Sequence, residues 1–154
     1  SQPMSLTEAI TLAIAVLGAV LGMTNTWRAL ENSRVKIRVR PQHAIPVGRT
    51  DPSLRFCIEI TNLSAFAITV NEVGVLYKGT SKRGAYIQPI TSSGLDWPCR
   101  LEPRSSVTIF GSPPINDNAN PLKCAYVETA CGVIKTGTSP ALQQIARAIR
   151  RKDL

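Results

Sequence analysis

The sequence predicts a mainly β protein: an antiparallel β-sandwich of about seven short strands, preceded by one long hydrophobic helix and followed by a short basic helix. Three observations lead to this prediction. An uncharged apolar run occupies residues 9–23, an apolar/polar alternation with a period of two begins near residue 34, and turn-forming residues separate the alternating stretches. The 154 residues leave room for one domain and an appendage. We therefore divide the chain into an anchor helix (1–33), a sandwich (34–138) and a basic tail (139–154).

The predicted N-terminal helix begins with a capping signal and ends in boundary residues. Ser5 and Glu8 have the spacing of a capping box. After the apolar run, Trp27 and Arg28 are an aromatic and a cation of the kind found at a membrane–water interface, and we assign them as interfacial anchors. A helix from Ala9 to Trp27 is about 28 Å long, close to the roughly 30 Å of a bilayer's hydrocarbon core, although its strictly apolar part covers only about 22 Å.

The surroundings of this helix are left open by the sequence. It is predicted either to span a membrane or to be buried between protein subunits of a large particle. A signal peptide is disfavoured, because no basic stretch precedes the apolar run and no convincing small-x-small cleavage site follows it.

One face of the helix carries small residues. Gly18 and Gly22 form a G-x-x-x-G pair, and Ala15 with Ala19 repeats the spacing. Small side chains let two helices approach closely in lipid, so we expect this face to mediate helix–helix contact, although glycine and alanine are also simply common in membrane helices. The contact residues that we predict are Thr11, Ala15, Gly18, Ala19 and Gly22.

The second distinctive feature is the positive charge, a formal +8 at pH 7. Basic residues follow the apolar run and only Glu8 precedes it, which by the positive-inside rule orients the C-terminal domain to the cytoplasm. The charge also suggests an acidic partner, although a basic surface that only aids solubility is an equal alternative. The predicted anionic-partner contacts are Lys36, Arg38, Arg40, Arg147, Arg150, Arg151 and Lys152.

The central region is read as successive strands. Aromatic residues are few (5%), so the core must consist mainly of Val, Ile, Leu and Ala. A parity shift near Asn71 predicts a bulge, and Ala130-Cys131-Gly132 predicts a tight hairpin. The expected strands cover residues 35–40 (ending at Pro41), 54–61, 66–77, 86–90, 107–110, 124–129 and 133–136.

Three stretches of this region, "FCIEITNLSAFAITVNEVGV", "LEPRSSVTIF" and "CAYVETACGVIKTG", resemble immunoglobulin-like or fibronectin-like sandwiches. The second resembles the lead into a late strand of that fold, with Arg104 where glycine is common. The likeness spans roughly residues 34–137 and implies an Ig-like sandwich. The chain also resembles small uncharacterised membrane-anchored proteins of bacteria and prophages. Such a fold does not by itself fix a function.

Ser139 and Pro140 predict the start of the C-terminal helix. Its apolar face is Leu142, Ile145, Ala146 and Ile149. Either this face packs on the sandwich, or the helix is a basic amphipathic segment that binds anionic lipid or nucleic acid.

Residues for catalysis are scarce. His43 is the single histidine, no phosphate-cradling glycine loop is present, and the acidic residues are spread singly. The four cysteines have no zinc-site spacing, and we expect free thiols, with Cys124 and Cys131 the pair nearest in sequence for a bridge in an oxidising compartment. We therefore expect no catalytic, cofactor or metal site.

The favoured function is a non-enzymatic, membrane-anchored interaction or scaffold protein that forms a homo-oligomer or larger complex through its N-terminal helix. The first alternative is a structural component of a phage virion or similar particle, with the helix between protein subunits. The second is a nucleic-acid-binding accessory protein, although no reader motif is present and aromatics for base stacking are few.

Overall fold

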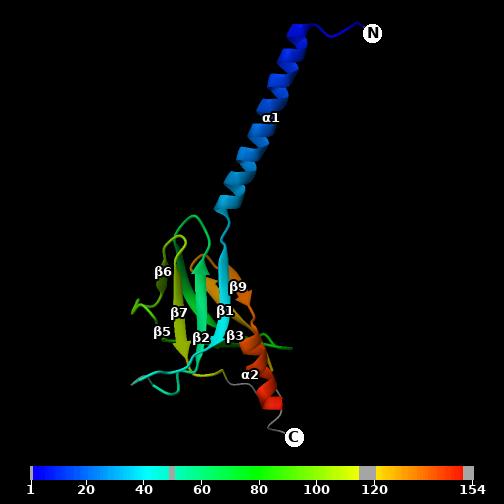
Figure 1. The fold of residues 1–154 in the computed structure, drawn as a ribbon. Helices are drawn as coiled ribbons and strands as arrows, with labels where there is room; N and C mark the ends of the chain where they lie inside the picture. The colour runs from blue at the N-terminus through cyan, green and yellow to red at the C-terminus, as the bar shows by residue number, and fades with distance from the viewer. Residues whose placement is uncertain (1, 49–50, 115–120, 151–154) are drawn as a thin grey trace. The chain divides into compact units, whose positions relative to one another are not determined.

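The computed structural model describes residues 2–48, 51–114 and 121–150, with the backbone alone for residues 149 and 150. These residues form an apolar N-terminal helix, nine strands in two antiparallel sheets and a short C-terminal helix (Figure 1). The predicted mainly β class with its two flanking helices is thus confirmed. By its internal contacts the chain divides into two compact units, Ser1–Arg34 and Val35–Leu154.

The first unit is the helix α1 (Leu6–Ser33), whose 28 residues give a length of about 42 Å. The predicted capping box is present: the Ser5 N–H donates to Glu8 Oε2 at 2.9 Å, and the Glu8 N–H donates to Ser5 Oγ at 3.3 Å. The helix ends where Arg34 adopts an extended conformation. The hydroxyls of Thr11, Thr24 and Thr26 donate to the carbonyls four residues earlier, at 2.8–2.9 Å. These three hydroxyls are therefore satisfied within the helix, which suits an apolar environment.

One sheet of the second unit, the β1 sheet, has the strand order β1-β2-β7-β5. Its strands are β1 (Ile37–His43), β2 (Phe56–Asn62), β7 (Ser106–Gly111) and β5 (Ile90–Thr91). β1 continues past Pro41, where the sequence predicted its end, because an edge strand tolerates a residue that has no N–H to donate. Pro41 is buried opposite Ile58, and its carbonyl accepts a hydrogen bond from Ser139 Oγ at 2.5 Å.

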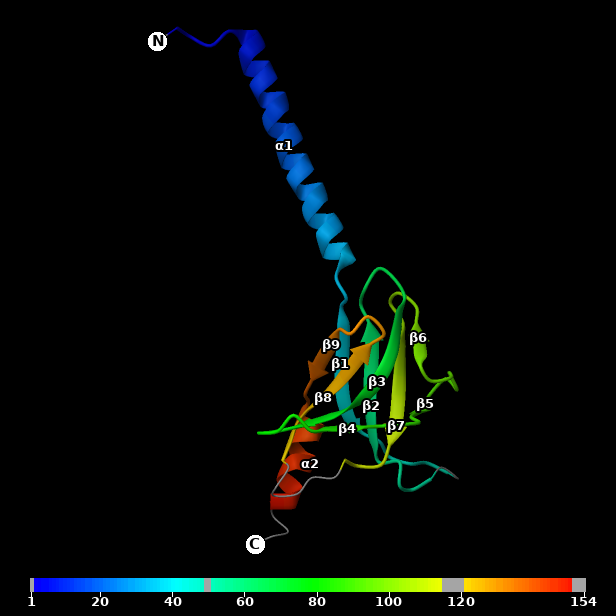
Figure 2. The same ribbon diagram turned by 180° about the vertical axis from the view of Figure 1, so that it is seen from behind.

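The other sheet, the β3 sheet, has the order β4-β3-β8-β9, and β6 also pairs with β3 (Figure 2). Its strands are β3 (Ile68–Tyr77), β4 (Arg83–Ala85), β6 (Cys99–Leu101), β8 (Leu122–Thr129) and β9 (Ile134–Gly137). The predicted bulge is present as a register shift between Val70 and Glu72. The predicted tight hairpin joins β8 to β9, with Gly132 at a φ of 82°.

The single strand predicted at 86–90 was wrong. The chain instead pairs first in β4 with the β3 sheet and then in β5 with the β1 sheet, so the residues between them must cross from one layer to the other. Tyr86 lies in this crossing, where its ring stacks on Phe56 with the ring centroids 6.5 Å apart. β6 is a further short strand that the sequence did not predict.

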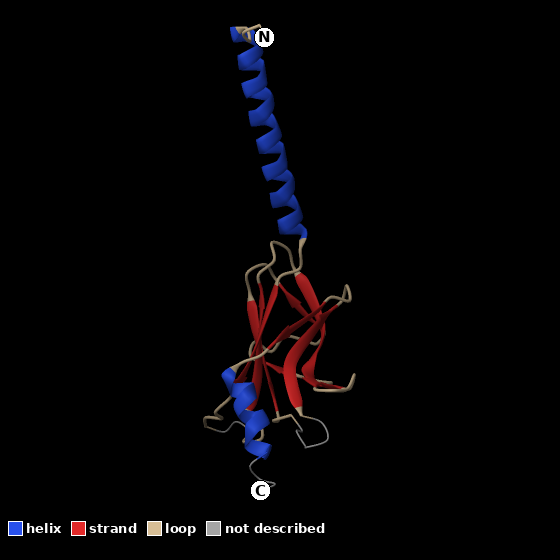
Figure 3. Cartoon of the chain, turned by 90° about the vertical axis from the view of Figure 1, so that its right-hand side faces the viewer, coloured by secondary structure: helices blue, strands red, loops and turns tan. Residues whose placement is uncertain are grey.

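The core lies between the inner faces of the two sheets and is mainly aliphatic, as the composition predicted. Its largest contributors from the β1 sheet are Phe56, Ile58, Ile60, Val107 and Ile109, and from the β3 sheet Leu101, Val70, Val73, Val75 and Val127. The helix α2 (Pro140–Arg150) adds Leu142, which is buried in the same cluster. α2 contacts β1 and β8, and Figure 3 shows it packed beside the strands.

The two sheets approach each other closely at one side, where β9 meets β1. A Cβ atom placed on Gly137 would lie 1.8 Å from the carbonyl oxygen of Val39, so only glycine fits there. The opposite edges carry very short strands, two residues in β5 and three in β4.

A buried asparagine ties one end of the sandwich together. Asn62 is fully buried, and its Nδ2 donates to the carbonyls of Phe66, Leu101 and Glu102 at 2.9, 3.1 and 3.2 Å. Its Oδ1 accepts from the Ser64 N–H at 2.9 Å. One side chain thereby links the end of β2 to the turn that follows it and to the end of β6.

Candidate functional site

The most exposed apolar surface of the chain is α1. No residue of this helix is buried within the described structure, and its large apolar side chains are exposed: Leu6, Ile10, Leu12, Ile14, Val16, Leu17, Val20, Leu21, Met23, Trp27 and Leu30. A continuous apolar surface of this size needs lipid or protein around it. By length and composition α1 is able to cross a membrane, and a signal sequence near an N-terminus meets the same criteria.

The predicted helix-contact residues lie along one side of α1 and are all exposed: Thr11, Ala15, Gly18, Ala19 and Gly22. A Cβ atom placed on Gly18 or Gly22 would meet nothing within 4 Å, apart from the helix's own backbone. The face therefore has room for a second backbone. The predicted interfacial residues Trp27 and Arg28 are also exposed, in the last third of the helix.

The predicted basic stripe on the first strand is only partly assembled. Arg38 and Arg40 are exposed on the outer face of β1, and Arg40 lies opposite Glu59 of β2, which offsets its charge. Lys36 precedes the strand and is half-buried, and its backbone N–H donates to Ser64 Oγ at 2.7 Å. The structure therefore brings together two of the three cations.

The C-terminal helix α2 packs on the sandwich. Ser139 caps it, because its Oγ accepts from the Leu142 N–H at 3.2 Å, and Ile145 and Ala146 pack against the core beside Leu142. Of the predicted basic residues of the tail, Arg147 is exposed. The side chain of Arg150 and the residues Arg151 and Lys152 lie outside the described part of the chain.

A polar cluster on the outer face of the β3 sheet was missed by sequence reasoning. Glu72 of β3 and Glu128 of β8 are cross-strand partners. Arg83 of β4 contacts both carboxylates, with N–O distances of 3.7 Å to Glu72 and 2.9 Å to Glu128, and its guanidinium lies 5.5 Å from the ring centroid of Tyr126. The buried Tyr126 hydroxyl donates to Glu72.

This cluster has a structural role. Burial and the hydrogen bond to Glu72 raise the pKa of Tyr126, so the phenol stays neutral and acts as a donor. Arg83 links the short edge strand β4 to β8, which it does not neighbour in the sheet. Only the strand register reveals the cluster, because its members are isolated acids and one arginine in the sequence.

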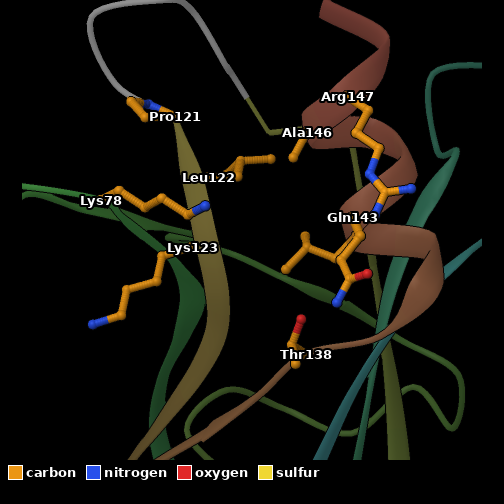
Figure 4. Close-up of a pocket in the computed structure, with 9 residues that line it drawn as sticks. Lys78, Pro121, Leu122, Lys123, Thr138, Gln143, Ala146 and Arg147 are labelled. Carbon is orange, nitrogen blue, oxygen red and sulfur yellow. The ribbon is translucent and has the colours of Figure 1, made fainter.

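A basic pocket of about 420 Å³ opens between the end of β3, the start of β8 and α2 (Figure 4). Its cations are Lys78, Lys123 and Arg147, and its neutral polar side chains are Thr138 and Gln143. Of these, only Arg147 belonged to the contacts predicted from the sequence. The other two cations were missed because the loop and strand that carry them meet α2 only in the fold.

The thiols differ in their surroundings. All four cysteines are unpaired as disulfides, and Cys57, Cys99 and Cys124 are buried, which raises the pKa of each thiol. Cys131 is exposed in the β8–β9 turn. The Thr129 hydroxyl, 3.0 Å from its Sγ, lowers the pKa of the Cys131 thiol.

Groups that could support catalysis or metal binding are dispersed. His43 is exposed at the end of β1. Within the described residues, no three or more His, Cys, Asp or Glu side chains gather as a metal site.

Comparison with known proteins adds no family: no family model matches the chain, and no curated protein matches it either. Its function must therefore be argued from α1, the sandwich surfaces and the basic pocket.

Proposed function

We propose that this chain is a non-enzymatic, membrane-anchored interaction or scaffold protein that works as a subunit of a larger assembly. The observation that carries the proposal is α1: 28 residues with an uncharged, mainly apolar run over residues 9–23, and with no residue buried against the rest of the described chain. The second unit buries its own core and needs nothing from α1 to complete it. A separate apolar helix joined to a domain that has its own complete core is the arrangement expected of a membrane-anchored protein.

We further propose that the sandwich is Ig-like. Its strand orders support this, because β1-β2-β7-β5 and β4-β3-β8-β9 correspond to strands A-B-E-D and C′-C-F-G of that fold. The chain departs from antibody domains in two ways: β6 is an added pairing on β3, and Cys57 of β2 and Cys124 of β8 are free thiols. Sandwiches of this type commonly present their loops and faces to other proteins, which agrees with a binding role but does not define the partner.

The small-residue face of α1 is the proposed assembly contact. Leucine at both Gly18 and Gly22 would keep two helix backbones apart, so it should shift the full chain toward smaller species in detergent, as measured by analytical ultracentrifugation. The control adds bulk to the opposite face of the helix, with Ala13→Leu and Val20→Leu. Unchanged oligomer size in the glycine double variant, or an equal shift in the control, would remove this contact from the proposal.

Alkaline carbonate extraction of native host membranes tests the anchor directly. We expect the full-length chain in the membrane pellet, with a mass that still includes α1. The variant Leu17→Lys/Leu21→Lys should move to the supernatant, because each lysine at the centre of a membrane helix costs about 2.5–3.5 kcal/mol. Asn25→Lys, near the end of the apolar run, is the control and should stay in the pellet.

Two other results would redirect the function. A released chain that lacks the residues of α1 would identify this segment as a signal sequence. A chain that co-sediments with a lipid-free particle would instead identify it as a structural subunit whose helix is buried in protein.

A further inference from the structure

The basic pocket is built from three parts of the second unit that are far apart in sequence. Lys78 directly follows β3, Lys123 lies in β8, and Arg147 projects from α2. The volume of about 420 Å³ falls within the range of small-ligand sites. Packing of α2 against the sandwich therefore creates a concave site rather than a flat basic surface.

The charges of this pocket lack compensation in the described part of the chain. None of Lys78, Lys123 and Arg147 forms an ion pair with a described residue, and no carboxylate lies among the described residues that line the pocket. By contrast, Arg83 and Arg100 on the sandwich each contact a glutamate. Gathering like charges around a concavity costs energy, which an anion inside it would recover.

The polar side chains of the pocket come from two sides. Figure 4 shows the Lys78 amine directed toward α2 and the Arg147 guanidinium alongside α2, with the Gln143 amide and the Thr138 hydroxyl below them. Lys123 points away along the rim. Two cations and two neutral hydrogen-bonding groups thus surround one space.

The remaining wall of the pocket is apolar. Its accessible apolar residues are the half-buried Pro121 and Ala146, whereas Leu122 and Leu142 are almost completely buried. An inorganic ion would cover only the polar half of such a site. A ligand that fills the pocket needs an anionic head and a small apolar body.

We propose that this pocket binds an organic phosphomonoester, with the phosphate between Lys78 and Arg147 and the organic group against Pro121 and Ala146. A phosphomonoester carries a charge of about −1.5 to −2 near neutral pH, which matches the two facing cations better than the single charge of a carboxylate. The guanidinium of arginine binds two phosphate oxygens at once, and lysine adds a point charge. This site does not depend on whether α1 is a membrane anchor.

Isothermal titration calorimetry of the full chain in phosphatidylcholine nanodiscs tests the proposal, with phenyl phosphate as the probe. Phenyl phosphate should bind more tightly than benzoate, which lacks the second charge, and more tightly than inorganic phosphate, which leaves the apolar wall uncovered. Arg147→Gln should weaken binding by about 10-fold or more, and Lys78→Gln/Arg147→Gln by about 100-fold, as expected for lost charge-assisted hydrogen bonds.

The matched control, Lys82→Gln/Arg104→Gln, removes the same two charge types from exposed positions elsewhere on the sandwich. It should bind phenyl phosphate as the parent chain does, and the melting temperatures of all variants should agree. The proposal is overturned if phenyl phosphate binds no better than benzoate, if the pocket variants bind like the parent, or if the control loses as much affinity as they do.

The same titration in nanodiscs that contain phosphatidic acid identifies the source of the phosphate. Competition by this lipid, seen as weaker phenyl phosphate binding in the parent chain but not in the Lys78→Gln/Arg147→Gln variant, would assign the pocket to a lipid headgroup. Unchanged binding of phenyl phosphate would assign it to a soluble phosphomonoester.

Discussion

Replacing Asn62 with alanine should strongly destabilise the sandwich. The two hydrogens on Nδ2 are shared among the carbonyls of Phe66, Leu101 and Glu102, and Oδ1 accepts from the Ser64 N–H. About three full hydrogen bonds are lost at about 1 kcal/mol each, and the buried partners that remain unpaired add to this cost. We expect the free energy of unfolding to fall by about 3–5 kcal/mol.

For a domain of this size such a loss lowers the melting temperature by about 10–20 °C. Thermal unfolding of the full chain in detergent, followed by the far-ultraviolet circular dichroism of the strands, measures it. Asn62→Asp separates hydrogen bonding from packing, because a carboxylate keeps the shape and the Ser64 bond but cannot donate to the three carbonyls. It should be at least as destabilising as alanine. Asn71→Ala, at an exposed position, is the control. If the free energy of unfolding falls by less than about 1 kcal/mol in both Asn62 variants, the hydrogen bonds of Asn62 do not stabilise the sandwich as argued.

Three further outcomes are expected. Gly137→Ala should lower the free energy of unfolding by about 2–3 kcal/mol, because the new methyl group would overlap the Val39 carbonyl oxygen. Denaturant unfolding measures this, and unchanged stability would show that the sheets separate freely at this position. Arg104→Gly should raise stability by up to about 1 kcal/mol, since Arg104 has a φ of +61°; a decrease in the denaturation midpoint would contradict this. Iodoacetamide should alkylate the native chain once, at Cys131, because this thiol is exposed and has a lowered pKa, whereas Cys124 is buried. Mass spectrometry of the peptides identifies the modified cysteine, and a second alkylated cysteine in the native chain would contradict this prediction.

Local patterns made part of this structure predictable. The spacing of Ser5 and Glu8 encodes a contact within one helical turn, and the parity shift near Asn71 is visible in the sequence because a bulge changes which residues face the core. The path after β3 was not predictable, because β4 and β5 are three and two residues long and owe their pairing to different sheets. Strands that short carry no periodicity.

The candidate sites differ in the same way: a site formed by neighbouring residues in the sequence was predictable, and a site formed by long-range pairing was not. The apolar run of α1 is continuous in sequence, so its exposed surface was expected from the start. Lys78 and Lys123 join Arg147 only because α2 packs across the end of β8, and Glu72 meets Glu128 only through the register of β3 and β8. Long-range pairing of this kind leaves no mark in the residues themselves.

The close approach of β9 to β1 affects whether neighbouring copies of the sandwich can pair through their edge strands. A strand with unpaired backbone groups is a template for further strands, and tethering to a two-dimensional surface raises the frequency of such encounters. Gly137 brings β9 against the outer edge of β1, so that neither strand presents a full ladder to a neighbouring molecule, and the opposite edges end in strands of two and three residues. The sandwich can therefore be crowded through its helix without its sheets joining edge to edge.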